Sequence, residues 1–408
     1  MTPKVKIEHV TKIFGDEPDG KALELLRAGH SKEAIRESTG HVVGVNAVNI
    51  DVAEGETFVV MGLSGSGKST LIRCVNRLYE PTAGRIVIDG TDVTALDSKD
   101  LQAFRRERTG MVFQHFALFP HRNVRSNVAF GLRVKGVDPE RRDAAAEEAL
   151  ALVGLTGYED SFPRQLSGGM QQRVGLARAL AIDPDILLMD EAFSALDPLI
   201  RRQMQDELME IQGKLRKTII FITHDLNEAL RVGSRVCVMR DGAVQQIGTP
   251  ADILMRPETD YVAEFVRDVD QGRVLTVEVV REEAATVAET AAARDVLQAV
   301  ESRWAEAAHV VDGDGKPLGV ITRESAERAA ARGADGLGDL IQQVPAVTGD
   351  TALAKVYQLF GSGLPIAVID GHGRLIGSVR PLRVLAELGR VEDVSERLSR
   401  SEAPEAPQ

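Results

Sequence analysis

Hydrophobic and polar positions follow strand-like patterns in several short segments of the chain. Residues 5–10 alternate apolar and polar side chains, which predicts a half-buried strand. Unbroken apolar runs, typical of strands buried on both faces of a sheet, occur at residues 186–189, 218–222 and 235–239. We expect further strands at residues 57–62 and 85–89, and helical segments separate several of these strands. This order predicts a parallel α/β sheet.

Residues 16–41 interrupt the pattern shortly after the first strand. Turn-forming residues cover positions 16–20, and Leu23, Leu26 and Ile35 then follow helical spacing. The pattern therefore predicts a helical insertion at this point.

The later part of the chain contains an internal repeat. Residues 309–321 and 367–379 align at a constant offset, and each copy places a tight Asp-Gly turn between two predicted strands. Two copies in register indicate a duplicated module. We therefore expect an α/β domain over residues 1–270, an α+β domain over 271–395 and a flexible acidic tail over 396–408.

Length, charge and cysteine content limit the classes of function. The 408 residues suffice for two or three domains, and a net charge of -12 argues against a nucleic-acid-binding protein. No stretch approaches the ~18 consecutive apolar residues of a membrane span, and residues 1–5 lack the core of a secretory signal, so we expect a cytoplasmic chain. Cys74 and Cys237 lie far apart in apolar surroundings. This excludes a disulfide framework, argues against a zinc site and predicts buried, inert thiols.

A phosphate-binding loop is the first chemical motif. It fits the pattern G-x-x-x-x-G-K-[ST] between a predicted strand and a predicted helix. Its glycines let backbone N–H groups approach phosphates closely, and the helix start favours negative charge. The lysine would neutralise the β- and γ-phosphates of ATP, and the following hydroxyl would coordinate Mg²⁺. The motif residues are Gly62, Leu63, Ser64, Gly65, Ser66, Gly67, Lys68, Ser69 and Thr70.

Two carboxylates follow the apolar run at residues 186–189. A buried strand there would bring Asp190 and Glu191 to the carboxyl edge of the sheet, where ligands of open α/β sheets bind. Asp190 suits the role of organising Mg²⁺. Glu191 suits that of a general base that positions and polarises the attacking water.

The segment at residues 166–173, Leu-Ser-Gly-Gly-Met-Gln-Gln-Arg, resembles the signature motif of ABC ATPases. The resemblance implies a P-loop ATPase fold with a helical signature subdomain. It also implies a homodimer in which the signature of one copy closes over the ATP held by the other. The residues implied to bind nucleotide in this way are Ser167, Gly168, Gly169 and Gln171, with Asp197 of a D-loop-like segment.

Other positions of the same family follow in order. Gln114 resembles the Q-loop glutamine, a Mg²⁺ and water ligand that reports to the membrane subunit, and His224 resembles the switch histidine that contacts the γ-phosphate. In the family an aromatic side chain near the end of the first strand usually stacks on adenine, and Phe14 is the candidate. The insertion separates Phe14 from the phosphate-binding loop by more than the usual spacing, and the alternative is a core residue at the strand end.

A narrower resemblance is to the ATPases of glycine betaine/proline importers. It rests on the insertion after Phe14, on residues 61–68 and 189–201, and on a C-terminal repeat similar to a tandem CBS module. The resemblance implies uptake of quaternary-ammonium osmolytes, with a membrane permease and indirectly a substrate-binding protein as partners, at the cytoplasmic face of the membrane. The alternatives are an importer for amino acids or polyamines and, less favoured by the single cassette and acidic charge, a soluble ABC ATPase of repair or translation.

The repeated module departs from adenosine-binding CBS domains, which commonly carry an aspartate three residues after the Ser/Thr that follows the second strand. Ser325 takes that position after Thr322, and in the second copy Arg380 and Arg383 replace hydroxyl and acid. The missing carboxylate argues against an ordinary adenosine nucleotide. Sensing of ionic strength or of a cyclic dinucleotide stays open, as does a purely structural dimerisation module.

Overall fold

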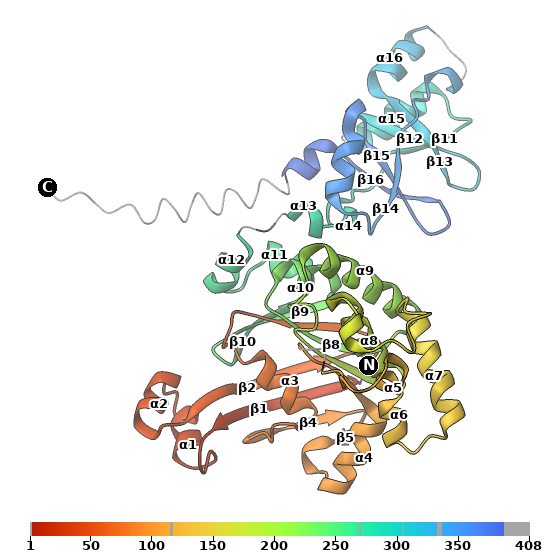
Figure 1. The fold of residues 1–408 in the computed structure, drawn as a ribbon. Helices are drawn as coiled ribbons and strands as arrows, with labels where there is room; N and C mark the ends of the chain where they lie inside the picture. Colours follow the sequence, from red (N-terminus) through yellow and green to blue (C-terminus); the bar gives the residue numbers. More distant parts are fainter. Residues whose placement is uncertain are drawn as a thin grey trace, which may run out of the picture. The chain divides into compact units, whose positions relative to one another are not determined.

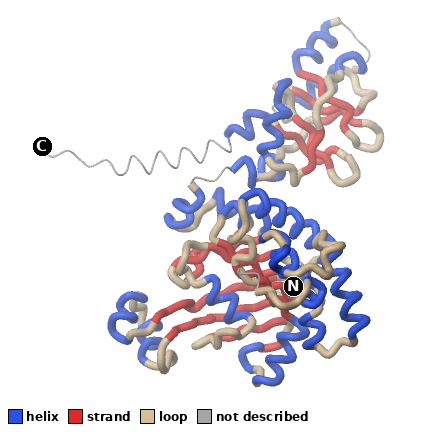
Figure 2. The backbone as a smooth tube through the Cα atoms, viewed as in Figure 1, coloured by secondary structure: helices blue, strands red, loops and turns tan. Residues whose placement is uncertain are grey.

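The computed structural model describes residues 2–114, 117–267, 269, 271–303, 305–332 and 337–386. The chain divides into two compact units, Met1–Val266 and Arg267–Gln408, each considered by itself below. Figures 1 and 2 show strands and covering helices in both units. The predicted tail at residues 396–408 lies outside the described residues.

A six-stranded sheet forms the centre of the first unit. Its strand order is β10-β9-β3-β8-β7-β6, and every neighbouring pair is parallel except β10 with β9. Its strands are β3 (Thr57–Met61), β6 (Thr109–Val112), β7 (Ile186–Asp190), β8 (Thr218–Thr223), β9 (Arg235–Arg240) and β10 (Ala243–Gly248). All residues of β3, β7 and β8 are buried. The parallel sheet predicted from the apolar runs is therefore confirmed.

A second sheet in this unit is antiparallel, which the strand predictions did not distinguish. Its order is β2-β1-β4-β5, with strands β1 (Val5–Phe14), β2 (Val42–Val52), β4 (Ala83–Ile88) and β5 (Thr91–Asp92). β1 continues beyond the predicted end at residue 10, and β2 was not predicted. The pairing of β1 with β2 is shifted at irregular positions, and His9 and Ala47 have positive φ there, so the two-residue alternation is interrupted in the sequence.

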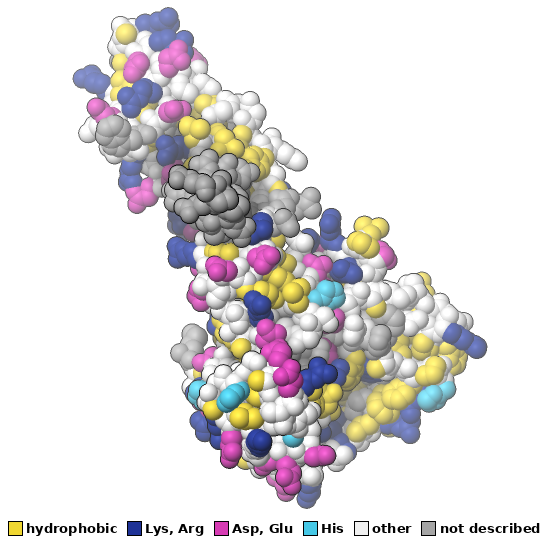
Figure 3. Space-filling view, turned by 90° about the vertical axis from the view of Figure 1, so that its left-hand side faces the viewer, with side chains coloured by type: hydrophobic (Ala, Val, Ile, Leu, Met, Phe, Trp, Pro, Cys, Tyr) yellow, Lys and Arg dark blue, Asp and Glu magenta, His cyan; other side chains and the backbone are white. Residues whose placement is uncertain are grey.

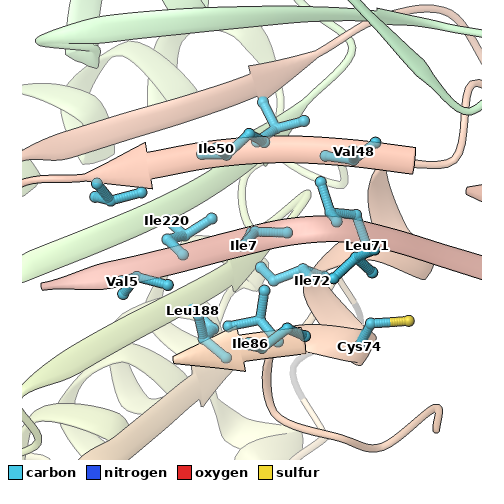
Figure 4. Packing of buried hydrophobic residues seen from close by; sticks show 14 of the residues in the cluster. Val5, Ile7, Val48, Ile50, Leu71, Ile72, Cys74, Ile86, Leu188 and Ile220 are labelled. Atoms are coloured by element: carbon cyan, nitrogen blue, oxygen red, sulfur yellow. The ribbon is translucent and has the colours of Figure 1, made fainter. Parts of the chain in front are cut away.

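Helix α3 (Lys68–Val75) packs against both sheets. One buried cluster joins Leu71 and Ile72 of α3 to Ile7 of the antiparallel sheet and to Leu188 and Ile220 of the parallel sheet (Figure 4). This packing fixes the start of α3 relative to the ends of the parallel strands.

The two cysteines are free and buried, as predicted. Burial raises the pKa of each thiol, Cys74 and Cys237, to about 12. A thiol with so high a pKa carries almost no reactive thiolate at neutral pH.

The predicted insertion forms two helices instead of one helical segment. α1 (Lys21–Arg27) and α2 (Lys32–Thr39) are separated by Gly29, whose φ is +86°, and by Ser31, which accepts a hydrogen bond from Ala34 N as the N-cap of α2. Their apolar side chains pack on Ile13 and Val43, at the end of the β1–β2 hairpin. The insertion thus extends this hairpin.

The remaining helices of the first unit surround the sheets (Figure 2). They are α4 (Ser98–Arg108), α5 (Val124–Val128), α6 (Phe130–Val134), α7 (Pro139–Leu152), α8 (Gly168–Leu180), α9 (Pro198–Leu215), α10 (Leu226–Val232), α11 (Pro250–Met255) and α12 (Asp260–Val266). Helices α5 to α8 pack on one another, and this is the helical subdomain expected from the signature motif. In the described part of the chain no helix is long and apolar enough to cross a bilayer.

The second unit contains the predicted duplication. Two three-stranded sheets have the same order, β11-β12-β13 and β14-β15-β16, each with one parallel and one antiparallel pair. The strands are β11 (Thr286–Ala288), β12 (Ala307–Val311), β13 (Pro317–Thr322), β14 (Ala346–Thr348), β15 (Ile366–Ile369) and β16 (Leu375–Val379). The helices are α13 (Gln271–Val274), α14 (Val277–Val280), α15 (Ala293–Ser302), α16 (Arg323–Ala331) and α17 (Leu353–Val356).

The surface charges are of both signs. On the face drawn in Figure 3, acidic and basic side chains are interspersed, without a continuous basic stripe among the described residues.

Candidate functional site

The phosphate-binding loop connects β3 to α3 and needs glycine at two close approaches. Gly62 has φ +150°, and a Cβ added there would lie 2.2 Å from Met239 O. Gly67 has φ +97°, and its Cβ would lie 2.3 Å from Gly44 O. Gly67 is also the N-cap of α3. Because glycine has no side chain that could cap the helix, the first N–H groups of α3 are available to a ligand.

Lys68 lies inside this loop. Its side chain is buried, and its Nζ donates to Gly62 O at 2.8 Å and Leu63 O at 2.9 Å. Burial lowers the pKa of Lys68, and the nearby Glu191 and Asp190 carboxylates act in the opposite direction. An amine held by loop carbonyls, beside free helix N–H groups, fits a phosphate chain.

The other loop residues either face outward or hold the loop. Leu63, Ser64 and Gly65 are exposed, whereas Ser66 is buried and its carbonyl accepts a hydrogen bond from Gly242 N at 2.9 Å. The turn at Gly242, after β9, therefore supports the loop from the neighbouring strand.

Asp190 and Glu191 stand at the carboxyl end of β7, as predicted. Asp190 is buried, and its Oδ1 accepts a hydrogen bond from Ser69 Oγ at 2.8 Å. A hydroxyl and a carboxylate so close together form a donor set that suits Mg²⁺. The residues present therefore fit the predicted cation.

Three side chains meet at Glu191. His224 Nδ1 lies 3.1 Å and Gln114 Nε2 3.5 Å from Glu191 Oε2. Glu191 has φ +47°, a left-handed conformation that is costly for a residue with a side chain and often marks a functional position. The sequence motifs for these three residues, far apart along the chain, thus converge on one carboxylate.

The signature residues begin a different helix. Ser167 is the N-cap of α8, and its Oγ accepts from Met170 N, while a Cβ on Gly169 would lie 2.7 Å from Ile200 Cγ2 of α9. The Gln171 amide donates to Pro163 O and Leu166 O, so in this structure it holds the signature loop.

Asp197 also acts as a cap. Its Oδ1 accepts from Leu199 N and Ile200 N, both at 3.1 Å, at the start of α9. Across the described residues, no hydrogen bond or ion pair joins Ser167 or Asp197 to Lys68 or Asp190. Within one chain, the motifs therefore form two separate groups.

Phe14 lies beside the phosphate-binding loop despite the insertion. It pairs with Val42 across the β1–β2 hairpin, and a Cβ on Gly44 would lie 2.8 Å from its ring. Gly44 in turn contacts Gly67. The hairpin therefore places Phe14 beside the phosphate-binding loop, and the insertion lies at the far end of the hairpin between β1 and β2. Its ring meets Tyr79 edge-on at 5.4 Å between centroids.

Sequence reasoning missed Arg73. Its Nη2 lies 3.2 Å from Asp190 Oδ2, and its Nη1 donates to Tyr79 Oη at 3.1 Å. The available signal was its position on α3, four residues after Ser69 and so on the same helix face.

The second unit contains a cavity of about 520 Å³ between its two repeats. His309 is buried in its wall, and its Nε2 bonds Ser378 Oγ at 2.9 Å. Among the residues that the structure describes, none hydrogen-bonds its Nδ1. Desolvation lowers the pKa of His309 to about 4.

The positions that depart from the CBS pattern have local roles. Thr322 caps α16 and bonds Ser325 Oγ at 3.0 Å. Arg380 and Arg383 both lie against Glu282, at 2.6 and 3.7 Å. Arg380 and Arg383, which follow the second copy of the repeat, thus form ion pairs with a carboxylate that precedes the first copy.

Comparison with known families agrees with this division. A family model described as ABC transporter matches residues 45–194, and one described as CBS domain matches residues 276–331. The predicted fold class, an ABC ATPase cassette followed by a CBS domain, is confirmed.

Curated relatives match nearly the whole chain. The glycine betaine transport ATP-binding protein of Bacillus subtilis is 49% identical over 377 residues, 92% of this chain and 90% of the relative. The glycine betaine/carnitine transport ATP-binding protein of Listeria monocytogenes is 47% identical, over 94% and 97%. The glycine betaine/proline betaine transport ATP-binding protein of Escherichia coli is 43% identical, over 96% and 98%.

Solved structures match about 60% of this chain. A dimeric bacterial ABC transporter cassette is 33% identical, with a TM-score of 0.51 over 60% of this chain and 98% of the other. A post-hydrolysis state of that cassette, bound to ADP and Pi, matches equally well. The chain therefore belongs to the ABC transporter family, as one of its ATP-binding subunits, which bind and hydrolyse ATP.

Proposed function

We propose that this chain drives the import of glycine betaine and related quaternary-ammonium or proline-type solutes, and so serves osmoprotection. The observation that carries the proposal is the length of the match: relatives named for glycine betaine transport align with both units, over 92 to 96% of this chain. A relative named for methionine import is 43% identical but aligns over only 59% of it. Full-length similarity thus favours a betaine importer over an amino-acid importer.

A second candidate solute is trimethylamine N-oxide. A relative of Ruegeria pomeroyi named for its transport is 54% identical, a higher value than that of the betaine relatives, although over 67% of this chain. Both solutes are small zwitterions with a fully substituted nitrogen. We place glycine betaine first because the match to the trimethylamine N-oxide relative covers only about two thirds of this chain.

The first group of motifs would hold Mg-ATP. Mg²⁺, when bound, would supply positive charge against the β- and γ-phosphates. We assign its protein ligands to Ser69, Asp190 and Gln114, and phosphate contacts to residues 62–70. Lys68 would exchange its present loop-carbonyl partners for phosphate oxygens, since an ionic partner is the stronger acceptor. Phe14 would stack on adenine.

Glu191 would act as the base. Its carboxylate would accept a hydrogen bond from the attacking water. His224 and Gln114, which lie within 3.5 Å of the Glu191 carboxylate, would orient this carboxylate and contact the γ-phosphate region. Its position at the end of a buried strand keeps that orientation fixed.

The second group of motifs would act across a homodimer. Ser167, Gly168, Gly169, Gln171 and Asp197 would meet the ATP bound to the partner copy. Support comes from their separation from Lys68 within one chain, from Leu199, which is 76% exposed beside Asp197, and from the dimeric form of the similar cassette. Two bound ATP molecules would then favour the closed dimer, and hydrolysis would release it.

The remaining partners follow from the importer role. We propose that the chain binds a membrane permease at the cytoplasmic face, that a substrate-binding protein acts indirectly, and that the second unit regulates transport. Its Glu282–Arg380–Arg383 cluster is a charged group suited to sensing ionic strength, and the cavity beside His309 leaves room for a cyclic dinucleotide.

Uptake in cells tests the solute. The chain would be deleted in its host, and uptake of labelled glycine betaine, trimethylamine N-oxide, methionine and spermidine measured at high osmolarity. We expect loss of glycine betaine uptake, restored by the wild-type chain and not by Glu191→Gln. Loss of methionine or spermidine uptake with normal glycine betaine uptake would contradict the proposal.

A further inference from the structure

Helix α3 presents two donors to one carboxylate. Ser69 and Arg73 are four residues apart and therefore lie one above the other on the same helix face. Ser69 Oγ donates to Oδ1 of Asp190 at 2.8 Å, and Arg73 Nη2 donates to Oδ2 at 3.2 Å. With a donor on each oxygen, the carboxylate cannot rotate without losing at least one hydrogen bond.

Arg73 is itself held in place by Tyr79. Its Nη1 donates to Tyr79 Oη at 3.1 Å, its guanidinium lies 5.6 Å from the Tyr79 ring centroid, and its carbonyl accepts from Tyr79 N at 2.9 Å. A partly exposed arginine would otherwise sample many rotamers. The planar guanidinium donates to Tyr79 and Asp190 from two different nitrogens held in a fixed geometry, whereas a lysine would have to reach both acceptors from its single nitrogen.

The same pair connects the two ends of the nucleotide site. The Tyr79 ring meets Phe14 edge-on, and Phe14 is the candidate adenine platform. Arg73 and Tyr79 thus connect Phe14, proposed to stack on adenine, to the Asp190 carboxylate, proposed to bind Mg²⁺. Lys68 contributes no ion pair to Asp190 in the described residues, since its amine is bonded to loop carbonyls.

We propose that Arg73 is a positioning residue of the nucleotide site: it holds the Asp190 carboxylate in the orientation that receives Mg²⁺, and Tyr79 holds Arg73. The inference rests on the proposed roles of Ser69 and Asp190. It assigns to Arg73 no contact with ATP or with Mg²⁺.

The test measures binding rather than turnover. Full-length protein would be titrated with a fluorescent ATP analogue at several Mg²⁺ concentrations and, separately, in EDTA. Arg73→Met keeps the aliphatic stem and removes both hydrogen bonds. We expect the affinity for the Mg-bound analogue to fall on the order of fivefold, as for loss of an ordinary hydrogen bond. The Mg²⁺ midpoint should rise by a similar factor, and binding in EDTA should be nearly unchanged.

Arg231→Met is the matched control. Arg231 also pairs with an aspartate, Asp206, and its side chain is 39% exposed, against 38% for Arg73. It should bind the analogue as the wild type does. Tyr79→Phe keeps the ring against Phe14 but removes the hydroxyl, and should shift the Mg²⁺ midpoint in the same direction by less.

The outcomes separate this inference from the proposed function. An unchanged Mg²⁺ midpoint in Arg73→Met, or an equal loss of affinity with Mg²⁺ and in EDTA, would overturn the positioning role. If Arg73→Met does not fold, Arg73→Lys and Tyr79→Phe decide, and wild-type midpoints in both would overturn it. If the wild type itself bound nucleotide without any Mg²⁺ dependence, the proposed cation site would fail instead.

Discussion

At the scale of single residues, Glu191 is the most sharply placed side chain of the site. It follows the last residue of a buried strand and has a left-handed backbone conformation. Its Oε2 lies within hydrogen-bond distance of both His224 Nδ1 and Gln114 Nε2. Glu191→Gln keeps the shape and removes the charge. We expect ATP hydrolysis to fall by roughly 10²-fold or more, the usual worth of a positioned base, while ATP still binds.

Two measurements check this substitution: steady-state phosphate release, and size-exclusion chromatography with Mg-ATP, where the uncleaved nucleotide should let a dimer accumulate. Near-normal turnover would move the role of base away from Glu191, and His224 would be the next candidate.

The residues of the site differ in how far the sequence predicts them. Lys68, Ser69, Asp190 and Glu191 follow from motifs in which residue type and spacing reflect phosphate chemistry. Arg73 does not, because its partner is 117 positions away and belongs to a strand that only the folded sheet brings beside α3. Its position four residues after Ser69 indicates a shared helix face, but no local pattern identifies Asp190 as the partner.

At the scale of elements, helix starts carry the second group of motifs. Ser167 caps α8, so Ser167→Arg both removes a cap and adds a bulky cation. We expect ATP binding to the monomer to persist and ATP-dependent dimerisation to be lost. Lys68→Ala, by contrast, should weaken binding itself, because it removes the amine from the phosphate-binding loop.

The control for Ser167→Arg is Ser167→Ala, which loses the same cap, at a cost of about 1 kcal/mol, without the added bulk. Isothermal titration calorimetry measures ATP affinity, and size-exclusion chromatography with Mg-ATP measures dimerisation. If Ser167→Arg lost ATP affinity as severely as Lys68→Ala, the role across the dimer would be wrong.

Strand prediction identified β1, β3, β4, β7, β8 and β9 but not β2, β5, β6 and β10. The strands β7, β8 and β9 are buried on both faces, so each appears in the sequence as an unbroken apolar run. β2 was missed because irregular pairing near Ala47 breaks its alternation. The distance of Phe14 along the chain was misleading for a related reason: antiparallel pairing brings Phe14 next to Val42, so an insertion within the hairpin does not change their separation in space.

His309, on β12, makes the stability of the second unit sensitive to acid. Its folded pKa of about 4 lies below the ordinary 6.5, so the unfolded chain takes up a proton first as the pH falls. The stability that His309 contributes is present above pH 6.5 and lost between 6.5 and about 4. At pH 5 the loss should approach about 2 kcal/mol.

Chemical unfolding at pH 7 and pH 5 checks this value. His309→Gln, whose amide nitrogen reaches about as far as the imidazole Nε2, can still bond Ser378 but cannot be protonated, so it should lose less stability between the two pH values than the wild type. His372→Gln, at the exposed turn between β15 and β16, is the control and should behave as the wild type. Equal losses in all three proteins would remove His309 as the cause.

At the scale of the whole molecule, the two compact units allow chemistry and regulation to be separated. A chain truncated after Gly272 keeps every residue assigned to ATP chemistry, so hydrolysis should survive. Residues 273–408 carry more acidic than basic side chains. A charged contact made by them would weaken as salt shortens the Debye length from ~10 Å at 0.1 M to ~3 Å at 1 M.

Transport by the full-length protein with its permease in proteoliposomes should therefore depend steeply on internal salt, and the truncated form should respond weakly. Initial uptake rates at increasing internal KCl measure both. Identical salt curves would instead favour a structural role for the repeated module.

The central claim is that ATP hydrolysis by this chain drives solute import, and simultaneous measurement of both processes tests it most directly. Vesicles would hold this chain, its permease and internal Mg-ATP, and phosphate released and labelled glycine betaine accumulated would be followed together. We predict that glycine betaine accumulates against its gradient in proportion to the phosphate released, and that Glu191→Gln abolishes both. Accumulation that continued undiminished in Glu191→Gln vesicles, or hydrolysis with no accumulation of any zwitterionic solute, would contradict the claim.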